Sequence, residues 1–202
     1  WKLAMEAFQE GFHTPKTHPQ LQQAAPNGNA QFGADAEGIP INEGLNARET
    51  VNQFVDYYAK LSEGMDGMVH KTEVAVLEKL RDMDVPDDPD QATLAFYGKA
   101  YEAGEQDARA RGADIFEFGK VAQEHPFHAV EFMFPHFFLL PMLGAMSAYR
   151  IRPLTPETCL FEIWSLAFLP DDDKRERVTA PTHLPYDSKD FPPIPQQDYS
   201  NL

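Results

Sequence analysis

Residues 149–164 read YRIRPLTPETCLFEIW, and this stretch decides the fold class. Apolar residues recur at alternate positions on both sides of the segment Pro153–Thr158, which itself carries two prolines and two threonines. Strict alternation is typical of strands that bury one face, and a proline-containing segment between two such runs is typical of a turn. The stretch therefore predicts a β-hairpin with two long arms across residues 147–169.

The residues before this hairpin carry helical patterns. We expect helices over 3–13, over 48–82 with a break at Gly64–Gly67, and over 91–112, with Gly112 as the cap. Residues 19–47 and 170–195 predict loops, residues 127–143 predict strands broken by prolines, and residues 196–202 predict the start of a helix that the end of the chain cuts off. Helices followed by antiparallel strands indicate an α+β fold with a sheet covered on one face.

Composition excludes several classes of function. The 202 residues have a formal net charge of −15, so generic binding to nucleic acid is excluded, as is docking on an anionic membrane. The prolines and the glycine within Phe132–Tyr149 argue against a membrane span there. The single cysteine, Cys159, cannot form an internal disulfide, a cysteine-based zinc site or an iron–sulfur cluster. A reducing cytoplasm is the expected location.

Two histidines near the N-terminus form the sharpest candidate site. His13 and His18 stand five residues apart and would lie on different faces of a continuous helix, but Pro15 ends the helix and lets the chain turn back. Neutral imidazole is the commonest metal ligand in proteins, and Glu10 lies three residues before His13. Two histidines and one carboxylate suit non-haem Fe(II), and zinc accepts the same ligands. The alternative is a pair of unrelated surface histidines.

Motifs at both ends of the chain resemble a known family. Residues 1–3 (WKL) and 10–19 (EGFHTPKTHP) are similar to the N-W-K … (D/E)-x-x-H-x4-H-P signature of Rieske-type ring-hydroxylating oxygenase α subunits, in their catalytic domain. Residues 194–202 (IPQQDYSNL) resemble the stretch around the carboxylate ligand of that family. Residues 134–137 (FPHF) and the hairpin around residues 149–164 are similar to further family segments, so the resemblance covers essentially the whole chain.

The resemblance implies a set of residue roles. His13, His18 and Asp198 would bind a mononuclear Fe(II), and Glu10 would be the bridging acid that passes electrons from the Rieske cluster of a neighbouring subunit. Many members have Asp at the bridging position, so Glu10 reaches one methylene further. The implied fold is a helix-grip (Bet v 1/START-like) antiparallel sheet with covering helices around an apolar cavity. Residues 1–202 would be a catalytic domain truncated at both ends, without the N-terminal Rieske [2Fe-2S] domain.

The implied activity is insertion of oxygen from O2 into an apolar, aromatic or cyclic substrate, by dihydroxylation or by monohydroxylation or demethylation, in aromatic hydrocarbon catabolism. A reductase, with or without a ferredoxin, would bring electrons from NAD(P)H, and the intact protein would be a homotrimer or an α3β3 assembly. The chain alone is expected not to turn over with NADH. Two alternatives stay open: a metal-free helix-grip module that binds a hydrophobic ligand, and a zinc-dependent hydrolase that uses the same three ligands.

Overall fold

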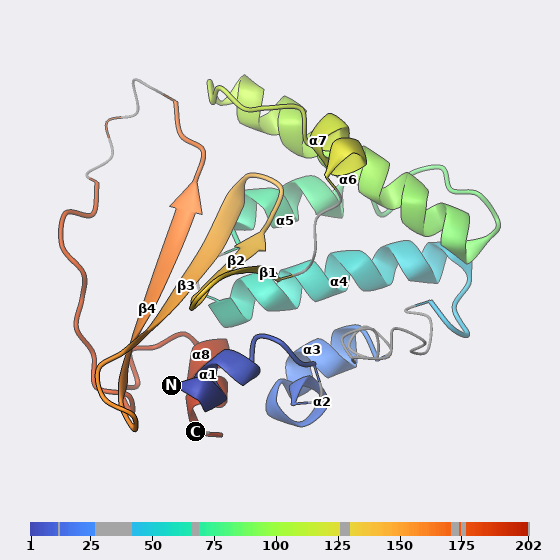
Figure 1. The fold of residues 1–202 in the computed structure, drawn as a ribbon. Helices are drawn as coiled ribbons and strands as arrows, with labels where there is room; N and C mark the ends of the chain where they lie inside the picture. Colours follow the sequence, from blue (N-terminus) through green and yellow to red (C-terminus); the bar gives the residue numbers. More distant parts are fainter. Residues whose placement is uncertain are drawn as a thin grey trace.

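The computed structural model describes residues 1–11, 13–26, 42–65, 69–125, 130–170, 174 and 177–201. Within these ranges the chain forms short N-terminal helices, then longer helices, then four strands and a final helix (Figure 1). The helices are α1 (Lys2–Glu6), α2 (Thr14–Thr17), α3 (Pro19–Ala24), α4 (Ala47–Met65), α5 (Lys71–Glu78), α6 (Pro89–Ala110), α7 (Phe118–Glu124) and α8 (Pro193–Tyr199). The strands are β1 (Glu131–Met133), β2 (Phe137–Pro141), β3 (Ala145–Pro153) and β4 (Cys159–Ala167).

The four strands form one antiparallel sheet in the order β1-β2-β3-β4. The predicted hairpin is confirmed, because Tyr149 pairs with Ile163 and Arg150 pairs with Glu162 across the two long strands. The alternation sorts the side chains as expected: Tyr149 and Ile151 are buried, whereas Arg150 and Glu162 form an ion pair. Prolines do break the earlier strands, since a turn at Pro135 separates β1 from β2.

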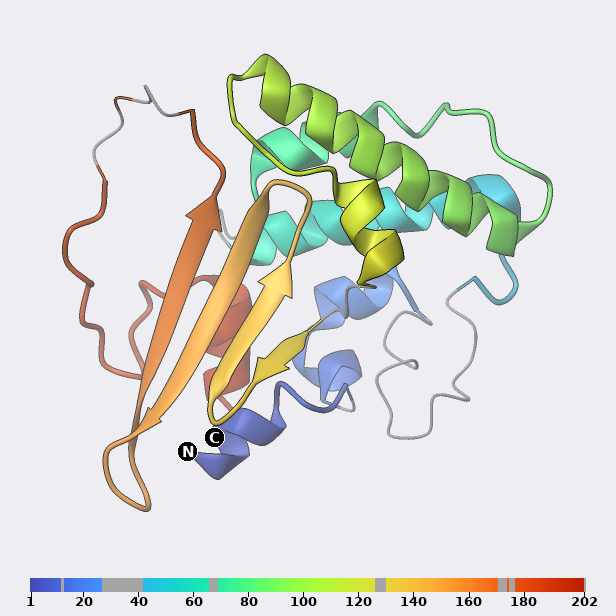
Figure 2. The same cartoon turned by 45° about the horizontal axis from the view of Figure 1, so that its top comes forward.

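Helices α4, α5 and α6 stack on one side of the sheet, and α1 and α8 lie near the end of the sheet where both termini are found (Figures 1 and 2). Phe138, Tyr149 and Ile151 of the sheet share a core cluster with Leu61 and Met65 of α4 and Ile194 of α8. A second cluster joins α4 to α6 through Phe54 and Phe96, whose rings stack at 5.1 Å. The fold is α+β with a helix-grip-like arrangement, as predicted.

The middle helices agree closely with the sequence pattern. The break predicted at Gly64–Gly67 separates α4 from α5. Asp88 accepts a hydrogen bond from the backbone of Gln91 and begins α6, and Gly112 follows this helix with a φ of +85°, a conformation that glycine adopts without strain. The free side chain of Cys159 is half-buried at the start of β4.

Three predictions about the ends of the chain are wrong. The helix expected over 3–13 ends at Glu6, and the expected loop over 19–47 begins with helix α3. The last helix starts at Pro193 and ends at Tyr199, rather than starting at 196 and running off the end of the chain. Proline favours the first turn of a helix, and this accounts for the starts of α3 and α8 at Pro19 and Pro193. Pro15 lies in α2 and does not explain the end of α1 at Glu6. Helix α7 was not predicted.

Candidate metal centre

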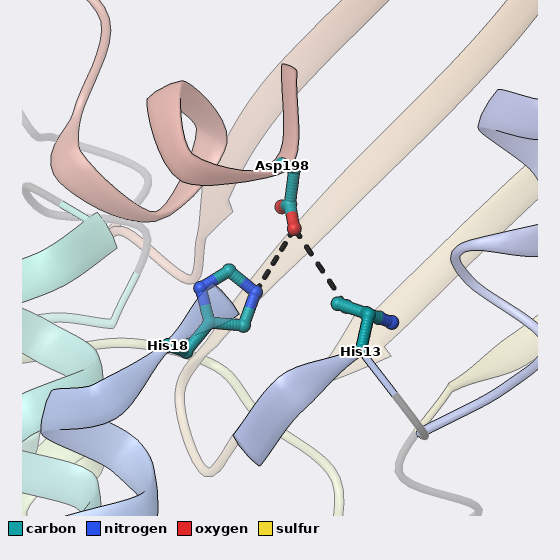
Figure 3. Close-up of side chains that lie close together, drawn as sticks. All are labelled: His13, His18 and Asp198. Atoms are coloured by element: carbon teal, nitrogen blue, oxygen red, sulfur yellow. Dashed lines mark ion pairs between the residues drawn. The ribbon is translucent and has the colours of Figure 1, made fainter. Parts of the chain in front are cut away.

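The structure brings His13, His18 and Asp198 together, although Asp198 is 180 residues from His18 in the sequence. One potential ligand atom from each residue lies within 4.8 Å of the other two. The Oδ1 atom of Asp198 is 2.9 Å from Nε2 of His18 and 3.7 Å from Nε2 of His13. Figure 3 shows this oxygen directed toward both imidazole rings. These are the three residues that the sequence resemblance paired with iron.

The N-terminal segment places both histidines by a sharp change of helix direction. His13 precedes α2, and His18 stands between α2 and α3, so Pro15 and Pro19 start the two helices immediately after them. The rings of His13 and His18 lie 5.5 Å apart at an angle of 78°. Two residues five positions apart therefore converge because the helix between them lasts only four residues, although the sequence predicted a turn rather than a helix over 14–17.

Glu10 fixes the ring of His13. One carboxylate oxygen of Glu10 lies 2.5 Å from Nδ1 of His13, and the other accepts a hydrogen bond from the backbone N–H of His13 at 3.1 Å. Glu10 and His13 meet outside a helix, in the segment between α1 and α2. A carboxylate at Nδ1 holds the proton on that nitrogen and leaves Nε2 with its lone pair toward Asp198.

Gln197 fixes the ring of His18. Its side-chain oxygen lies 2.8 Å from Nδ1 of His18 and accepts a second hydrogen bond, 2.9 Å long, from Gln20. The amide group of Gln197 donates in return to Gln20 at 3.2 Å. The sequence analysis missed both glutamines, because no local spacing links residues that are 177 positions apart. The one signal present was the position of Gln197 next to Asp198.

Helix α8 carries Asp198 and is anchored against the other site elements. Ile194 packs so closely on Gly64 of α4 that a Cβ atom at Gly64 would lie 2.6 Å from Cδ1 of Ile194. Beyond the last turn, Asn201 donates a hydrogen bond of 2.8 Å to the hydroxyl of Thr17 in α2. The ring of Tyr199 contacts Phe161 of β4 at 5.2 Å. The carboxylate of Asp198 is therefore held by contacts to α4, α2 and the sheet.

The donor set fits a cation. Oδ1 of Asp198 is buried and makes no hydrogen bond with the described residues, although it faces two imidazole nitrogens. Because both Nδ1 atoms face oxygen acceptors, both Nε2 atoms present lone pairs toward a carboxylate oxygen, and this arrangement is repulsive unless a positive charge lies between them. A proton on Nε2 of His18 or a metal ion shared by the three atoms would relieve the repulsion.

Electrostatics favour positive charge at His18. Burial alone would lower the pKa of His18, but its pairing with the negative carboxylate of Asp198 and its hydrogen bond with Gln197 outweigh burial and raise that pKa. The side chain of His18 is 5 % exposed, compared with 23 % for His13 and 25 % for Asp198. The site is thus closed on the side of His18 and accessible on the side of the other two ligands.

A cavity of about 900 Å³ opens beside the three residues. His13, His18 and Asp198 belong to its wall, and apolar side chains from α4, the sheet and the N-terminal segment form most of the remainder. The larger apolar and aromatic lining residues are Phe8, Leu21, Phe54, Tyr57, Tyr58, Leu61, Met65, Tyr97, Val130, Phe132, Leu140, Met142, Tyr149 and Ile194. A cavity with one polar corner and apolar walls is the usual form of a small-molecule site.

Comparison with protein families adds an independent finding. The family model described as the ring hydroxylating alpha subunit (catalytic domain) matches residues 1–202. Neither the comparison with curated proteins nor the comparison with solved structures gave a match. Among the described residues, no helix is both long and apolar enough to cross a bilayer.

Proposed function

Because the chain belongs to the family of ring hydroxylating alpha subunit catalytic domains, we propose that His13, His18 and Asp198 hold a mononuclear iron ion at which oxygen from O2 is inserted into an apolar substrate. The observation that carries the proposal is the convergence of two imidazole Nε2 atoms on the buried Oδ1 of Asp198. Two histidines and one carboxylate with free positions is the donor set of non-haem iron oxygenases.

The iron, when bound, would activate O2 for attack on the substrate, and the residues of the chain prepare the site for that chemistry. Glu10 and Gln197 keep the Nδ1 protons in place, so both Nε2 atoms are available as ligands. The apolar walls exclude water and position an aromatic or cyclic substrate beside the ligands. Dihydroxylation, monohydroxylation and demethylation are all consistent with this arrangement.

Glu10 has a second proposed role. In the family that the sequence resembles, the acid at this position passes electrons from the Rieske cluster of a neighbouring subunit to the iron. The contact of Glu10 with Nδ1 of His13 supports the proposal, because it connects the partly exposed carboxylate of Glu10 directly to a ligand. The whole protein would then include a Rieske [2Fe-2S] domain, work as a homotrimer or an α3β3 assembly in the cytoplasm, and receive electrons from NAD(P)H through a reductase, with or without a ferredoxin.

The test is iron binding by the full-length protein. His13→Ala, His18→Ala and Asp198→Ala should each lose most of their bound iron, measured by metal analysis and by Fe(II) titration under anaerobic conditions. His183→Ala is the matched control, because His183 is exposed and lies outside the cluster. An unchanged iron content in all three ligand variants would contradict the assignment of these residues as iron ligands.

Activity separates the oxygenase from the alternatives. Product formation in the wild-type protein should require both O2 and a reductant and should be abolished in the ligand variants. Turnover without O2 would instead indicate a hydrolase. Ligand binding without turnover, in a protein that takes up no iron, would indicate the metal-free binding module.

A further inference from the structure

The described residues that line the cavity beside the candidate metal centre include carboxylates but no lysine or arginine. Among the residues that line it, Glu10 and Asp198 are acidic and both lie at the histidine end. Outside the described ranges, the sequence contains one further lysine or arginine, Arg175. A negatively charged ligand in this cavity would therefore find no guanidinium or ammonium group among the described lining residues.

This charge distribution disfavours an anionic ligand whether or not the metal site is filled. Transfer of a carboxylate from water into an apolar cavity is costly unless a cation pairs with it. A bound divalent ion would cancel the two negative charges of Glu10 and Asp198 and leave no excess positive charge at this end of the cavity to pair with an anion. The net charge of −15 on the chain adds a repulsive field for anions approaching from solvent.

Three tyrosines add neutral hydroxyls to the lining of the cavity. Tyr57 and Tyr58 of α4 and Tyr97 of α6 line the cavity, and we refer to them as the tyrosine group. The rings of Tyr57 and Tyr58 lie 6.3 Å apart, and Tyr97 contacts Phe54 at 5.1 Å. Tyr57 and Tyr58 stand about two turns, or ~10 Å, along α4 from Gly64, where α8 packs. Along α4, Tyr57 and Tyr58 are therefore separated from the point where the helix that carries Asp198 packs.

The hydroxyls of the tyrosine group are not occupied by hydrogen bonds to other described residues. None of them is among the fully enclosed polar atoms that lack a partner. Burial raises the pKa of all three, that of Tyr97 to about 12, so they remain neutral near pH 7. A neutral hydroxyl donates a hydrogen bond to a carbonyl, ether or hydroxyl oxygen without requiring a charged partner.

We propose that the cavity selects an uncharged, apolar ligand that carries one oxygen acceptor for the tyrosine group, and that it rejects the corresponding carboxylate. This inference rests on the proposed function only in that the ligand is the substrate of the oxygenase. An oxygenase of this specificity would act on neutral ring compounds and not on aromatic acids.

The test compares three probes of similar ring structure: 2-acetylnaphthalene, naphthalene and 2-naphthoate. Their Kd values are measured at pH 7 with the full-length protein, anaerobically and without reductant, in the iron-free and the iron-loaded form. We expect the ketone to bind at least about tenfold more tightly than the carboxylate in both forms. Equal or tighter binding of 2-naphthoate would overturn the proposal, as would a failure of both neutral probes to bind.

Variants test the hydrogen bond separately from the shape of the cavity. Tyr57→Phe, Tyr58→Phe and Tyr97→Phe each remove one hydroxyl. At least one of these variants should raise the Kd of the ketone by about two- to tenfold and leave the Kd of naphthalene unchanged. Tyr101→Phe is the matched control, because Tyr101 lies next to Tyr97 but not on the cavity wall. Unchanged ketone binding in all three variants would contradict the role of the tyrosine group.

The two proposals can fail independently. If His13→Ala keeps its iron but the ketone is still preferred, the proposed metal site is wrong and the ligand selectivity holds. If His13→Ala loses its iron but 2-naphthoate binds best, the metal site holds and the inferred substrate class is wrong.

Discussion

The Nδ1 atom of His18 lies 2.8 Å from the side-chain oxygen of Gln197, the residue immediately before Asp198. One turn of helix α8 therefore supplies both a candidate metal ligand and the group that orients another candidate ligand. Because Gln197 also exchanges hydrogen bonds with Gln20 of α3, this part of α8 is joined to the helix that follows His18. The geometry of the site therefore depends on the position of α8.

Gln197→Leu should weaken Fe(II) binding by about ten- to hundredfold, because His18 would lose the acceptor that fixes its ring and its tautomer. Anaerobic Fe(II) titration of the full-length protein measures the effect. Gln196→Leu is the control, since Gln196 donates to the backbone of Lys189 and Phe191 and does not contact His18. Equal losses in the two variants would show that the effect comes from α8 as a whole.

Gly64→Ala should displace α8. The new methyl group would lie 2.6 Å from Cδ1 and 2.7 Å from Cγ1 of Ile194, closer than packed atoms allow. We expect an overpacking cost of about 1–3 kcal/mol in urea unfolding, together with weaker iron binding. Gly98→Ala on α6 is the control, because a Cβ atom there meets nothing within 4 Å; it should stabilise the protein by up to about 1 kcal/mol.

A double-mutant cycle identifies the contact responsible. Ile194→Ala removes both atoms that the new methyl group would meet, so Gly64→Ala should cost less in that background than in the wild-type protein. Additive costs would mean that the strain lies elsewhere on α4.

The end motifs predicted the family, the fold class and the three residues that cluster. They could do so because His13 and His18 are joined by a short proline turn and Asp198 belongs to a recognisable segment. Gln197 and Gln20 were missed, since their contact depends on how α8 packs against α3, and no periodicity encodes that arrangement. Helix α7 was missed because it has only seven residues and one buried side chain, Phe118.

Asp88→Ala should destabilise the protein by about 1 kcal/mol, because the side chain of Asp88 caps α6 by accepting from the backbone N–H of Gln91. Urea unfolding measures the change. Asp87→Ala removes a neighbouring charge without removing the cap and should have a much smaller effect. Iron content should be unchanged in both variants, since α6 contributes no residue to the cluster. A stability equal to wild type in Asp88→Ala would contradict the capping role.

Helix α5 carries two glutamates whose environments differ. Glu73 is buried, with one carboxylate oxygen accepting from the backbone N–H of Gly144 and the other without a hydrogen-bond partner among the described residues. Burial raises the pKa of Glu73 above its ordinary value of 4.5, and backbone hydrogen bonds and the charge of Arg111 offset only part of this effect. Glu78 is exposed, and its hydrogen bond with Arg81 lowers its pKa.

The two glutamates should therefore change stability in opposite directions with pH. Because its pKa is raised in the folded state, Glu73 contributes most to the free energy of unfolding below pH 4.5 and loses this contribution as pH rises through its folded pKa. Glu73→Gln should therefore gain stability relative to wild type as pH rises. Because its pKa is lowered in the folded state, Glu78 stabilises the protein above pH 4.5, and this stabilisation is lost as pH falls. Glu78→Gln should therefore be less stable than wild type at neutral pH and equally stable in acid. Urea midpoints from pH 2.5 to pH 8 measure both differences. If Glu73→Gln instead lost stability relative to wild type on going to higher pH, its carboxylate would be the favoured form in the folded protein, and burial could not be the dominant influence on it.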